Sequence, residues 1–163
     1  MRFHHMALVV SDLAEAIRLW RDVLGFELVV EKTIPDGPVP GPKTLMHAAL
    51  LDDIFQVKYA RSRMGWLKSA AGAMIELQQC ENPPVHRTPP DRLRYGDTGI
   101  REIGLEVDDI ESWFTKIRSA GYETQTNYIW SSGNFARSFL FYDKDGNMIQ
   151  LWQHIPRAVR GVS

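Results

Sequence analysis

The chain has 163 residues, and its 19 lysines and arginines almost balance its 20 aspartates and glutamates, giving a formal net charge of −1. This length suffices for one hydrophobic core, and the balanced charge excludes the broad cationic surface with which proteins bind nucleic acid or anionic membranes. With a single cysteine, Cys80, no cleavable apolar leader and no apolar run of membrane-spanning length, the sequence predicts a protein of the reducing cytoplasm.

The chain opens with a predicted strand and a capped helix. Residues 3–10 are rich in strand-forming side chains, and Asp12 with Glu15 three positions later makes a helix-capping pattern. Gly25 is suited to ending this helix because glycine adopts positive φ without strain. Apolar residues recur along one helix face, at Leu13, Ile17, Trp20 and Leu24. The first two elements are therefore a β-strand and an α-helix.

The rest of the first half is predicted to be mostly β. A strand covers residues 26–33, and the prolines and glycines of residues 35–42 make that segment a loop. Three further β-like stretches follow, over residues 45–51, 54–60 and 73–79. Between the last two, a short helix is predicted over residues 61–71.

The opening pattern returns after a linker. Residues 83–98 contain two proline pairs among charged residues, which is typical of a linker. A strand is then predicted over residues 100–107, followed by a helix that Asp109 can cap and Gly121 can end. Three closing strands follow, over residues 124–128, 136–142 and 147–153, the last two joined by a hairpin.

The two halves lie nearly in register. Asp109 follows Asp12 by 97 positions, and Gly121 follows Gly25 by 96. Such a spacing indicates an internal duplication. The sequence therefore predicts one α+β domain of two tandem βαβββ modules. Its parts are module one (1–82), a linker (83–98), module two (99–155) and a C-terminal tail (156–163).

Polar residues interrupt the apolar pattern at equivalent positions of the two modules. Strand alternation turns the apolar residues of each first strand toward its helix and leaves His5 and Glu102 on the opposite face. His4 is expected to point the other way from His5. In the closing strands, Glu76 and Gln150 each stand between two apolar neighbours. Any one of these residues alone is as easily a structural side chain, and only the four together indicate a functional site.

This set of four polar residues suits a divalent metal ion. Two carboxylates that face one cavity repel each other unless a proton or a cation compensates them. One imidazole, two carboxylates and one amide oxygen favour an octahedral divalent ion with positions open for water or substrate. We expect one such ion, with zinc, manganese, cobalt, nickel and magnesium all suitable. Its predicted ligands are His5, Glu76, Glu102 and Gln150.

The opening of the chain resembles the vicinal-oxygen-chelate superfamily, which includes glyoxalase I, methylmalonyl-CoA epimerase, extradiol dioxygenases, fosfomycin-modifying enzymes and bleomycin-binding proteins. The similarity is carried by His-Met-Ala-Leu-Val-Val-Ser-Asp-Leu from His5 and by residues 19–26, and residues 103–110 and 139–151 resemble the start and end of the second module. The resemblance implies a cup-shaped mixed sheet around a metal site, with the helices outside, and a homodimer.

The resemblance also implies the positions of the metal ligands. In this superfamily they lie on the first and fourth strands of each module, which match His5, Glu76, Glu102 and Gln150. The chain departs from the usual pattern at two of these positions, because Glu102 stands where histidine is usual and Gln150 where glutamate is usual.

The first functional hypothesis is a metal-dependent isomerase or epimerase, or a glyoxalase-type lyase. It would abstract a proton next to the carbonyl of a small hydroxy-ketone, a sugar-like ketone or an acyl-CoA, with the metal stabilising the enolate. Glu76 and Glu102 are the candidate catalytic residues, and His47, Lys58 or Tyr59 are alternative bases. Candidate substrate-binding residues are His47, Tyr59, Trp130, Arg137 and Trp152.

Three alternatives remain. A metal-free, ligand-sequestering protein of the drug-resistance type would use an aromatic cleft, for which the chain offers Trp66, Trp130, Trp152, Tyr59 and Tyr128. An extradiol-type dioxygenase needs two histidines and a carboxylate, and only His5 supplies an imidazole among the four positions. A fosfomycin-type transferase meets the same objection.

Overall fold

The computed structural model describes residues 1–156 and divides into two compact units, Met1–Arg87 and Thr88–Ser163. The boundary between them falls inside the segment predicted as a linker. The predicted C-terminal tail, apart from Pro156, lies outside the described residues.

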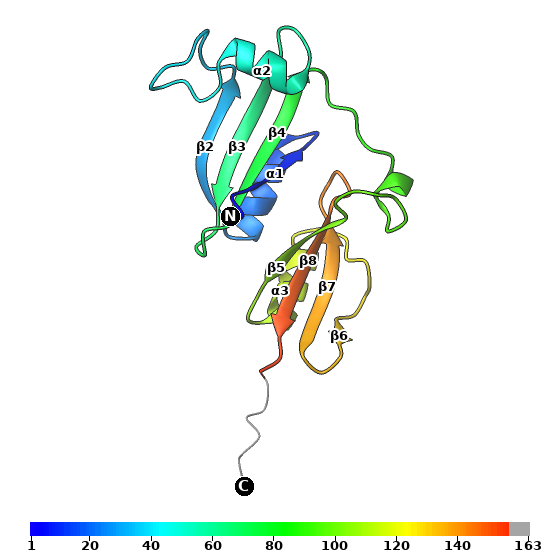
Figure 1. The fold of residues 1–163 in the computed structure, drawn as a ribbon. Coiled ribbons are helices and arrows are strands. Elements are labelled where there is room, and N and C mark those ends of the chain that lie inside the picture. The colour runs from blue at the N-terminus through cyan, green and yellow to red at the C-terminus, as the bar shows by residue number, and fades with distance from the viewer. Residues whose placement is uncertain (157–163) are drawn as a thin grey trace. The chain divides into compact units, whose positions relative to one another are not determined.

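The first unit is built on a four-stranded mixed sheet (Figure 1). In spatial order β1-β4-β3-β2, β1 pairs with β4 in parallel, and the other neighbours pair antiparallel. The strands are β1 (Met6–Val9), β2 (Glu27–Ile34), β3 (Arg61–Lys68) and β4 (Met74–Asn82). Each of these strands except β3 overlaps a segment that was predicted to be a strand.

Helix α1 (Leu13–Ile17), which continues as a π-helix (Arg18–Val23), covers one face of this sheet. The Asp12 side chain accepts a hydrogen bond from the Glu15 amide at 3.1 Å, so the predicted cap is confirmed. Gly65 of β3 lets the helix come close, because a Cβ there would lie 3.3 Å from a terminal carbon of Ile17. The helix therefore packs on the bare backbone of the central strand.

The two strands predicted over residues 45–51 and 54–60 are wrong. Most of this stretch is helix α2 (Ala48–Phe55), and the His47 ring caps it by accepting a hydrogen bond from the Leu50 amide at 3.3 Å. Figure 1 shows α2 lying across the end of the sheet where β2 ends and β3 begins. Short apolar runs suit either state, and burial of Leu51 against the sheet favours the helix here.

The helix predicted over residues 61–71 is also wrong, because this segment forms β3. Met64 belongs to a buried cluster with Ile34 of β2, Leu51 of α2 and Ala60. The neighbouring Gly65 and Leu67 are also buried. A strand covered on both faces lacks the alternation of apolar and polar residues by which strands are recognised.

The second unit repeats the same sheet topology. In order β5-β8-β7-β6, β5 pairs with β8 in parallel and the other pairs are antiparallel. Its strands are β5 (Glu102–Glu106), β6 (Trp130–Ser132), β7 (Ala136–Tyr142) and β8 (Met148–His154). A 3-10 helix (Pro90–Leu93) precedes them, and helix α3 (Ile110–Ser119) follows β5. Asp109 caps α3, as predicted.

The strand predicted over residues 124–128 is wrong. Only an isolated bridge joins Thr124 to Phe141, and the regular strand begins later, at Trp130. Within the predicted segment the Thr126 hydroxyl donates to the Tyr128 carbonyl at 2.6 Å. Such local side-chain hydrogen bonds compete with the ladder of a sheet.

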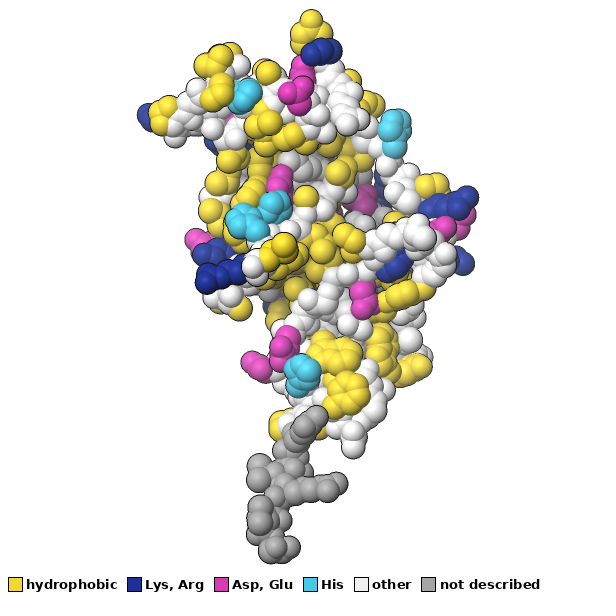
Figure 2. All heavy atoms as spheres, viewed as in Figure 1, with side chains coloured by type: hydrophobic (Ala, Val, Ile, Leu, Met, Phe, Trp, Pro, Cys, Tyr) yellow, Lys and Arg dark blue, Asp and Glu magenta, His cyan; other side chains and the backbone are white. Residues whose placement is uncertain are grey.

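The duplication extends to the register of the paired strands. Ala7 is opposite Glu76 in β1 and β4, and Gly104, 97 positions after Ala7, is opposite Gln150 in β5 and β8. The prediction of an α+β fold with two tandem βαβββ modules is therefore confirmed. Among residues 1–156, no helix has the length and apolarity needed to cross a bilayer. On the face drawn in Figure 2, cationic and anionic side chains are interspersed.

Candidate functional site

In the first unit, the sheet face opposite α1 carries the predicted polar residues. Paired residues share a face, so Trp66 of β3 lies on the same face as Glu76, and Met64 on the same face as Gln78. Alternation within β4 places Gln78 beside Glu76 on this face. Ile75 and Leu77, on the other face, are buried. The polar positions of β4 thus lie on the side that α1 does not cover.

His5 and Glu76 contact each other on this face. The imidazole Nε2 lies 3.3 Å from Glu76 Oε2, and the two side chains are 34% and 14% exposed. A second nitrogen of His5, Nδ1, lies 2.7 Å from His4 Nδ1. In the tautomer in which His5 donates this Nδ1 proton to His4, its Nε2 lone pair faces Glu76 Oε2, and a cation bound by both atoms would offset their repulsion. Histidine binds metal ions in this state.

His4 lies beside His5, contrary to the expectation that it points to the opposite face. Its ring centroid is 5.9 Å from that of Trp66, and the His5 ring is 5.1 Å from the same indole. Strict alternation does not hold because both histidines precede β1. The buried Nε1 of Trp66 has no hydrogen-bond partner within the described residues.

Gln78 holds the other oxygen of the Glu76 carboxylate. Its Nε2 donates to Glu76 Oε1 at 2.6 Å, and its own Oε1 accepts from the Ser62 hydroxyl at 2.6 Å. Both Gln78 and Ser62 are buried. This pair was not predicted from the sequence, although the polar residues at positions 76 and 78 of one strand were a signal that both side chains share a face.

Cys80 is next on the same strand face and is partly buried. Burial raises the pKa of its thiol, although a hydrogen bond with Ser62 acts in the other direction. A thiol with a raised pKa is a weak nucleophile at neutral pH. The structure therefore gives no reason to add Cys80 to the candidate catalytic residues.

In the second unit, Glu102 is bound by a residue from the linker segment. The Tyr95 hydroxyl donates to Glu102 Oε2. The pKa of Tyr95 is raised to about 12, first by burial and then by the hydrogen bond and the negative charge of Glu102. Nothing in the sequence indicated this contact, because Tyr95 precedes β5 in a stretch without periodic pattern.

Gln150 is half-buried on β8, between the buried Ile149 and Leu151. Its amide oxygen lies over β5, where a Cβ added to Gly104 would be 3.8 Å away. Three positions later, Gln153 accepts a hydrogen bond at 3.3 Å from the amide of Ile110, the first residue of α3. Gln150 is therefore available as an oxygen donor, whereas Gln153 serves the helix.

Two of the predicted substrate-binding residues belong to the first unit, where one caps a helix and the other has an exposed side chain. His47 caps α2 through its ring. Tyr59 is 88% exposed with a φ of 59°, and its carbonyl accepts from Asn82 at 2.8 Å. Neither contact joins these residues to His5 or Glu76.

The other three belong to the second unit. Trp152 lies on the same face of β8 as Gln150, and its ring centroid is 6.2 Å from that of Phe135. Trp130 lies on the edge strand β6. Arg137 pairs with Glu111 of α3 instead. It therefore lies on the helix-covered face, opposite Gln150, because neighbouring β7 residues alternate and Phe139 packs against Phe114 of α3.

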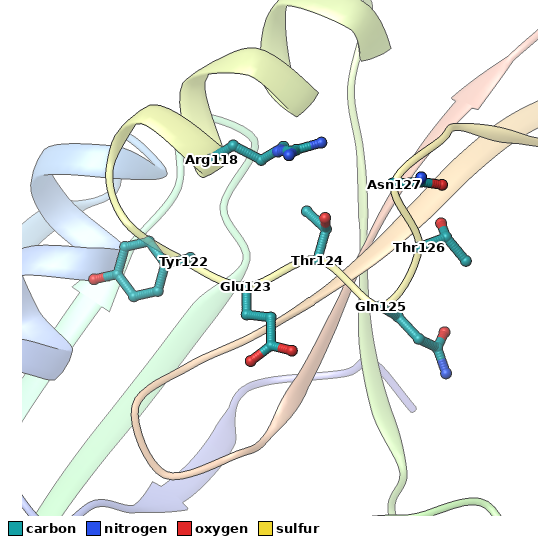
Figure 3. A pocket seen from close by; sticks show the side chains of 7 residues that line it. All are labelled: Arg118, Tyr122, Glu123, Thr124, Gln125, Thr126 and Asn127. Atoms are coloured by element: carbon teal, nitrogen blue, oxygen red, sulfur yellow. The ribbon is translucent and has the colours of Figure 1, made fainter.

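Surface pockets lie elsewhere within each unit. One of about 300 Å³ is lined by Arg118 at the end of α3 and by residues 122–127 after it (Figure 3). Another, of about 280 Å³, is formed by residues 52, 53 and 56–58. No predicted metal ligand lines either pocket.

The donors of the first unit fit a divalent ion. Two donors bound at right angles and at about 2.1 Å to an octahedral ion lie about 3 Å apart, close to the 3.3 Å between His5 Nε2 and Glu76 Oε2. Over residues 1–156, no three histidine, cysteine, aspartate or glutamate side chains cluster as a complete metal site. Each unit thus presents half of the predicted donor set.

Comparison with known proteins gives a family and a fold. The family model described as the glyoxalase/bleomycin resistance protein/dioxygenase superfamily matches residues 2–151. No curated protein matches the chain. A glyoxalase family protein from Bacillus cereus superposes with a TM-score of 0.78 at 16% identity, covering 96% of this chain and 95% of that one.

Two further solved structures share the fold. The fosfomycin resistance protein FosX from Listeria monocytogenes, complexed with Mn(II) and sulfate, has a TM-score of 0.57 at 16% identity and covers 93% and 91% of the two chains. TnmS3, an antibiotic binding protein from a Streptomyces species, has a TM-score of 0.54 at 18% identity and covers 95% and 97%. At these identities the similarity shows the fold alone.

Proposed function

The chain belongs to the glyoxalase/bleomycin resistance protein/dioxygenase superfamily, and from this premise we propose that it is a metal-dependent isomerase or epimerase. Its substrate would be a small hydroxy-ketone, a sugar-like ketone or an acyl-CoA. The observation that carries the proposal is the contact between His5 and Glu76, an imidazole and a carboxylate held 3.3 Å apart on the sheet face that α1 does not cover.

The proposed ligands of the ion are His5, Glu76, Glu102 and Gln150. A divalent ion at these donors supplies a Lewis acid that stabilises negative charge on a substrate oxygen. Gln150 contributes a neutral oxygen, so the four donors together carry two negative charges when both glutamates are ionised. This charge matches a divalent cation without an excess that would repel an enolate.

We assign the proton transfer to Glu102 rather than to Glu76. Glu76 is in contact at both oxygens, with Gln78 at 2.6 Å and His5 at 3.3 Å. Glu102 accepts a hydrogen bond from one tyrosine hydroxyl. A carboxylate with fewer fixed contacts reorients more easily toward a substrate carbon, as a general base requires. Glu102 would leave the ion to remove the α-proton. In an isomerase it would return the proton to the neighbouring carbon, and in an epimerase a second group would protonate the opposite face.

The test has a binding arm and a chemical arm. Mn(II) binding is measured by titration calorimetry on the metal-free protein, and exchange of carbon-bound hydrogen with D₂O is followed by NMR with hydroxyacetone as the first substrate. We expect about one ion per chain and exchange that is lost in Glu102→Gln. Absence of binding for Mn(II), Co(II), Ni(II) and Zn(II) would contradict the proposal.

A second candidate function is sequestration of a ligand without catalysis. The aromatic cluster of Trp66, His4 and His5 supports it, and so does the antibiotic-binding relative TnmS3. In that case an aromatic antibiotic would quench the tryptophan fluorescence of metal-free protein, and Trp66→Ala would weaken the binding. A homodimer and a cytoplasmic location remain predictions from the sequence.

A further inference from the structure

We infer that Gln78 is a positioning residue that fixes the Glu76 carboxylate, so that Oε2 faces His5 while Oε1 is engaged by a hydrogen bond. The inference rests on the proposed metal-binding role of Glu76 and deepens it. Gln78 itself is not placed in contact with the ion. Its role is to select one orientation of the neighbouring ligand.

The hydrogen-bond chemistry of Gln78 leaves one arrangement. The side chain is 8% exposed, and a buried amide needs partners for both its oxygen and its nitrogen. An ionised carboxylate only accepts, so the Gln78 Nε2 must be the atom that faces Glu76 Oε1, at 2.6 Å. The amide oxygen then points away from Glu76, toward Ser62.

Ser62 completes the arrangement from the adjacent strand. Its hydroxyl has one proton and lies near three possible acceptors, Gln78 Oε1 at 2.6 Å, the Arg63 carbonyl at 3.1 Å and the Cys80 sulfur. The shorter distance favours donation to Gln78. Because Ser62 is fully buried, water does not compete for this hydrogen bond. A flip of the Gln78 amide would turn its oxygen toward the Glu76 carboxylate, which has no proton to donate when ionised, so Glu76 opposes the flip. The Ser62 hydroxyl can donate or accept, and in the observed orientation it gives the buried amide oxygen its partner.

The consequence for Glu76 is a carboxylate presented through one oxygen. With Oε1 held by Gln78, the oxygen on the side of His5 Nε2 is Oε2, 3.3 Å away. Groups that orient a metal ligand in this way typically change metal affinity by about 10-fold to 100-fold when they are removed.

Comparison of the two units separates Gln78 from the glutamines that serve the fold. Gln79 accepts from the amide of Leu13, the first residue of α1, at 2.9 Å, just as Gln153 accepts from the first residue of α3. The helix-capping glutamine therefore repeats. Gln78 does not, because Trp152 stands two positions after Gln150 where Gln78 follows Glu76. An amide needed only for the shared fold would be expected in both units.

The experiment compares Gln78→Met with Gln79→Met, a neighbouring glutamine on the opposite face. Mn(II) affinity is measured by calorimetry, and the imidazole ¹⁵N shifts of His5 are recorded on metal-free protein at fixed pH. We expect Gln78→Met to weaken Mn(II) binding by about 10-fold to 100-fold and to change the His5 shifts. Gln79→Met should leave both unchanged while lowering the denaturant midpoint.

The outcomes separate this inference from the proposed function. Wild-type Mn(II) affinity together with unchanged His5 shifts in Gln78→Met would overturn the positioning role and leave the metal site standing. If the wild type bound no Mn(II), the proposed function would fail, and the His5 shifts of the metal-free variants alone would decide whether Gln78 positions Glu76.

A second variant covers the case in which Gln78→Met does not fold. Ser62→Ala removes the hydroxyl that donates to the Gln78 amide oxygen and keeps the amide itself. We expect a change in the His5 shifts in the same direction and weaker Mn(II) binding, by a smaller factor than for Gln78→Met. Unchanged shifts and affinity in Ser62→Ala would count against the inference.

Discussion

The two units have one sheet topology and one strand register, yet they hold their candidate ligands differently. In the first unit, His5 and Glu76 contact each other, and Gln78 and Ser62 fix the carboxylate from the buried side. In the second unit, Glu102 is bound by Tyr95, which precedes the sheet. A duplicated backbone thus gives equivalent positions, whereas the neighbours of each position decide whether a side chain is fixed or free to move.

The largest expected effect concerns the hydrophobic cores of the two units. Phe139 is fully buried and packs edge-on against Phe114, with ring centroids 5.0 Å apart, whereas the helix-covered face of the first unit has the fully buried aliphatic Leu67 on β3. We expect Phe139→Ala to lower the free energy of unfolding by about 3–5 kcal/mol and Leu67→Ala by about 2–5 kcal/mol. Chemical denaturation monitored by circular dichroism measures both. A loss under about 1 kcal/mol for Phe139→Ala would mean that the aromatic packing is not a main stabiliser.

The candidate ligands of the first unit and those of the second differ in their expected contribution to metal binding. Because His5 lies beside a fixed carboxylate, His5→Ala should weaken Mn(II) binding by more than the roughly 100-fold that the loss of an orienting group can cost. Gln150→Ala removes a neutral donor and should cost only about tenfold. Calorimetry on both variants measures the difference. Equal losses would show that the two units contribute equally and would contradict the asymmetry.

The helix-capping glutamines should behave alike in the two units. Gln79→Met and Gln153→Met each leave a helix N-terminal amide without its acceptor, which costs about 1 kcal/mol of unfolding free energy. Neither variant should alter Mn(II) affinity. Denaturant midpoints give the stability, with the wild type as reference, and an affinity change in either variant would mean that the caps also shape the site.

The contact between Tyr95 and Glu102 can be tested without metal. The pKa of Tyr95 is raised to about 12 by burial, by its hydrogen bond to Glu102 and by the charge of Glu102. Glu102→Gln removes the charge, so the pKa of Tyr95 should fall part of the way toward 10. Difference absorbance of the phenolate against Tyr95→Phe identifies this residue among the five tyrosines. An unchanged titration would exclude the contact in solution.

The smallest expected effect distinguishes two loop aspartates by pH. Lys32, at 2.7 Å, and the amides of Met46 and Leu45 lower the pKa of Asp36 in the first unit. Burial raises the pKa of Asp143 in the second. A lowered pKa contributes stability that is present at neutral pH and lost as the pH falls below about 4 through the folded value. A raised pKa lowers the stability at neutral pH, and this loss is recovered as the pH falls through the folded value.

The measurement compares the free energies of unfolding of Asp36→Asn and Asp143→Asn with the wild type at pH 7 and at acidic pH. The deficit of Asp36→Asn should be largest at pH 7 and shrink in acid. For Asp143→Asn, the stability relative to the wild type should fall on acidification, because the wild type gains a favoured proton. The same slope for both variants would contradict the assigned directions.

Much of the fold was predictable because its signals are local. Asp12 and Asp109 cap their helices as predicted, since capping depends on a side chain and an amide three residues apart. The closing strands β4, β7 and β8 also lie at the predicted places. The repeat of 97 positions relates β1 to β5, where Ala7 and Gly104 lie opposite Glu76 and Gln150.

The tertiary structure decided the elements whose character depends on distant contacts. Residues 48–55 became a helix because Leu51 is buried with Met64 and Ile34, and β3 lost the alternation of a strand because both of its faces are covered. Likewise the sequence singled out Glu76 and Glu102, but not that Gln78 and Tyr95 would bind them. A local pattern shows which face a side chain occupies, and only packing between strands and segments shows which partners it meets there.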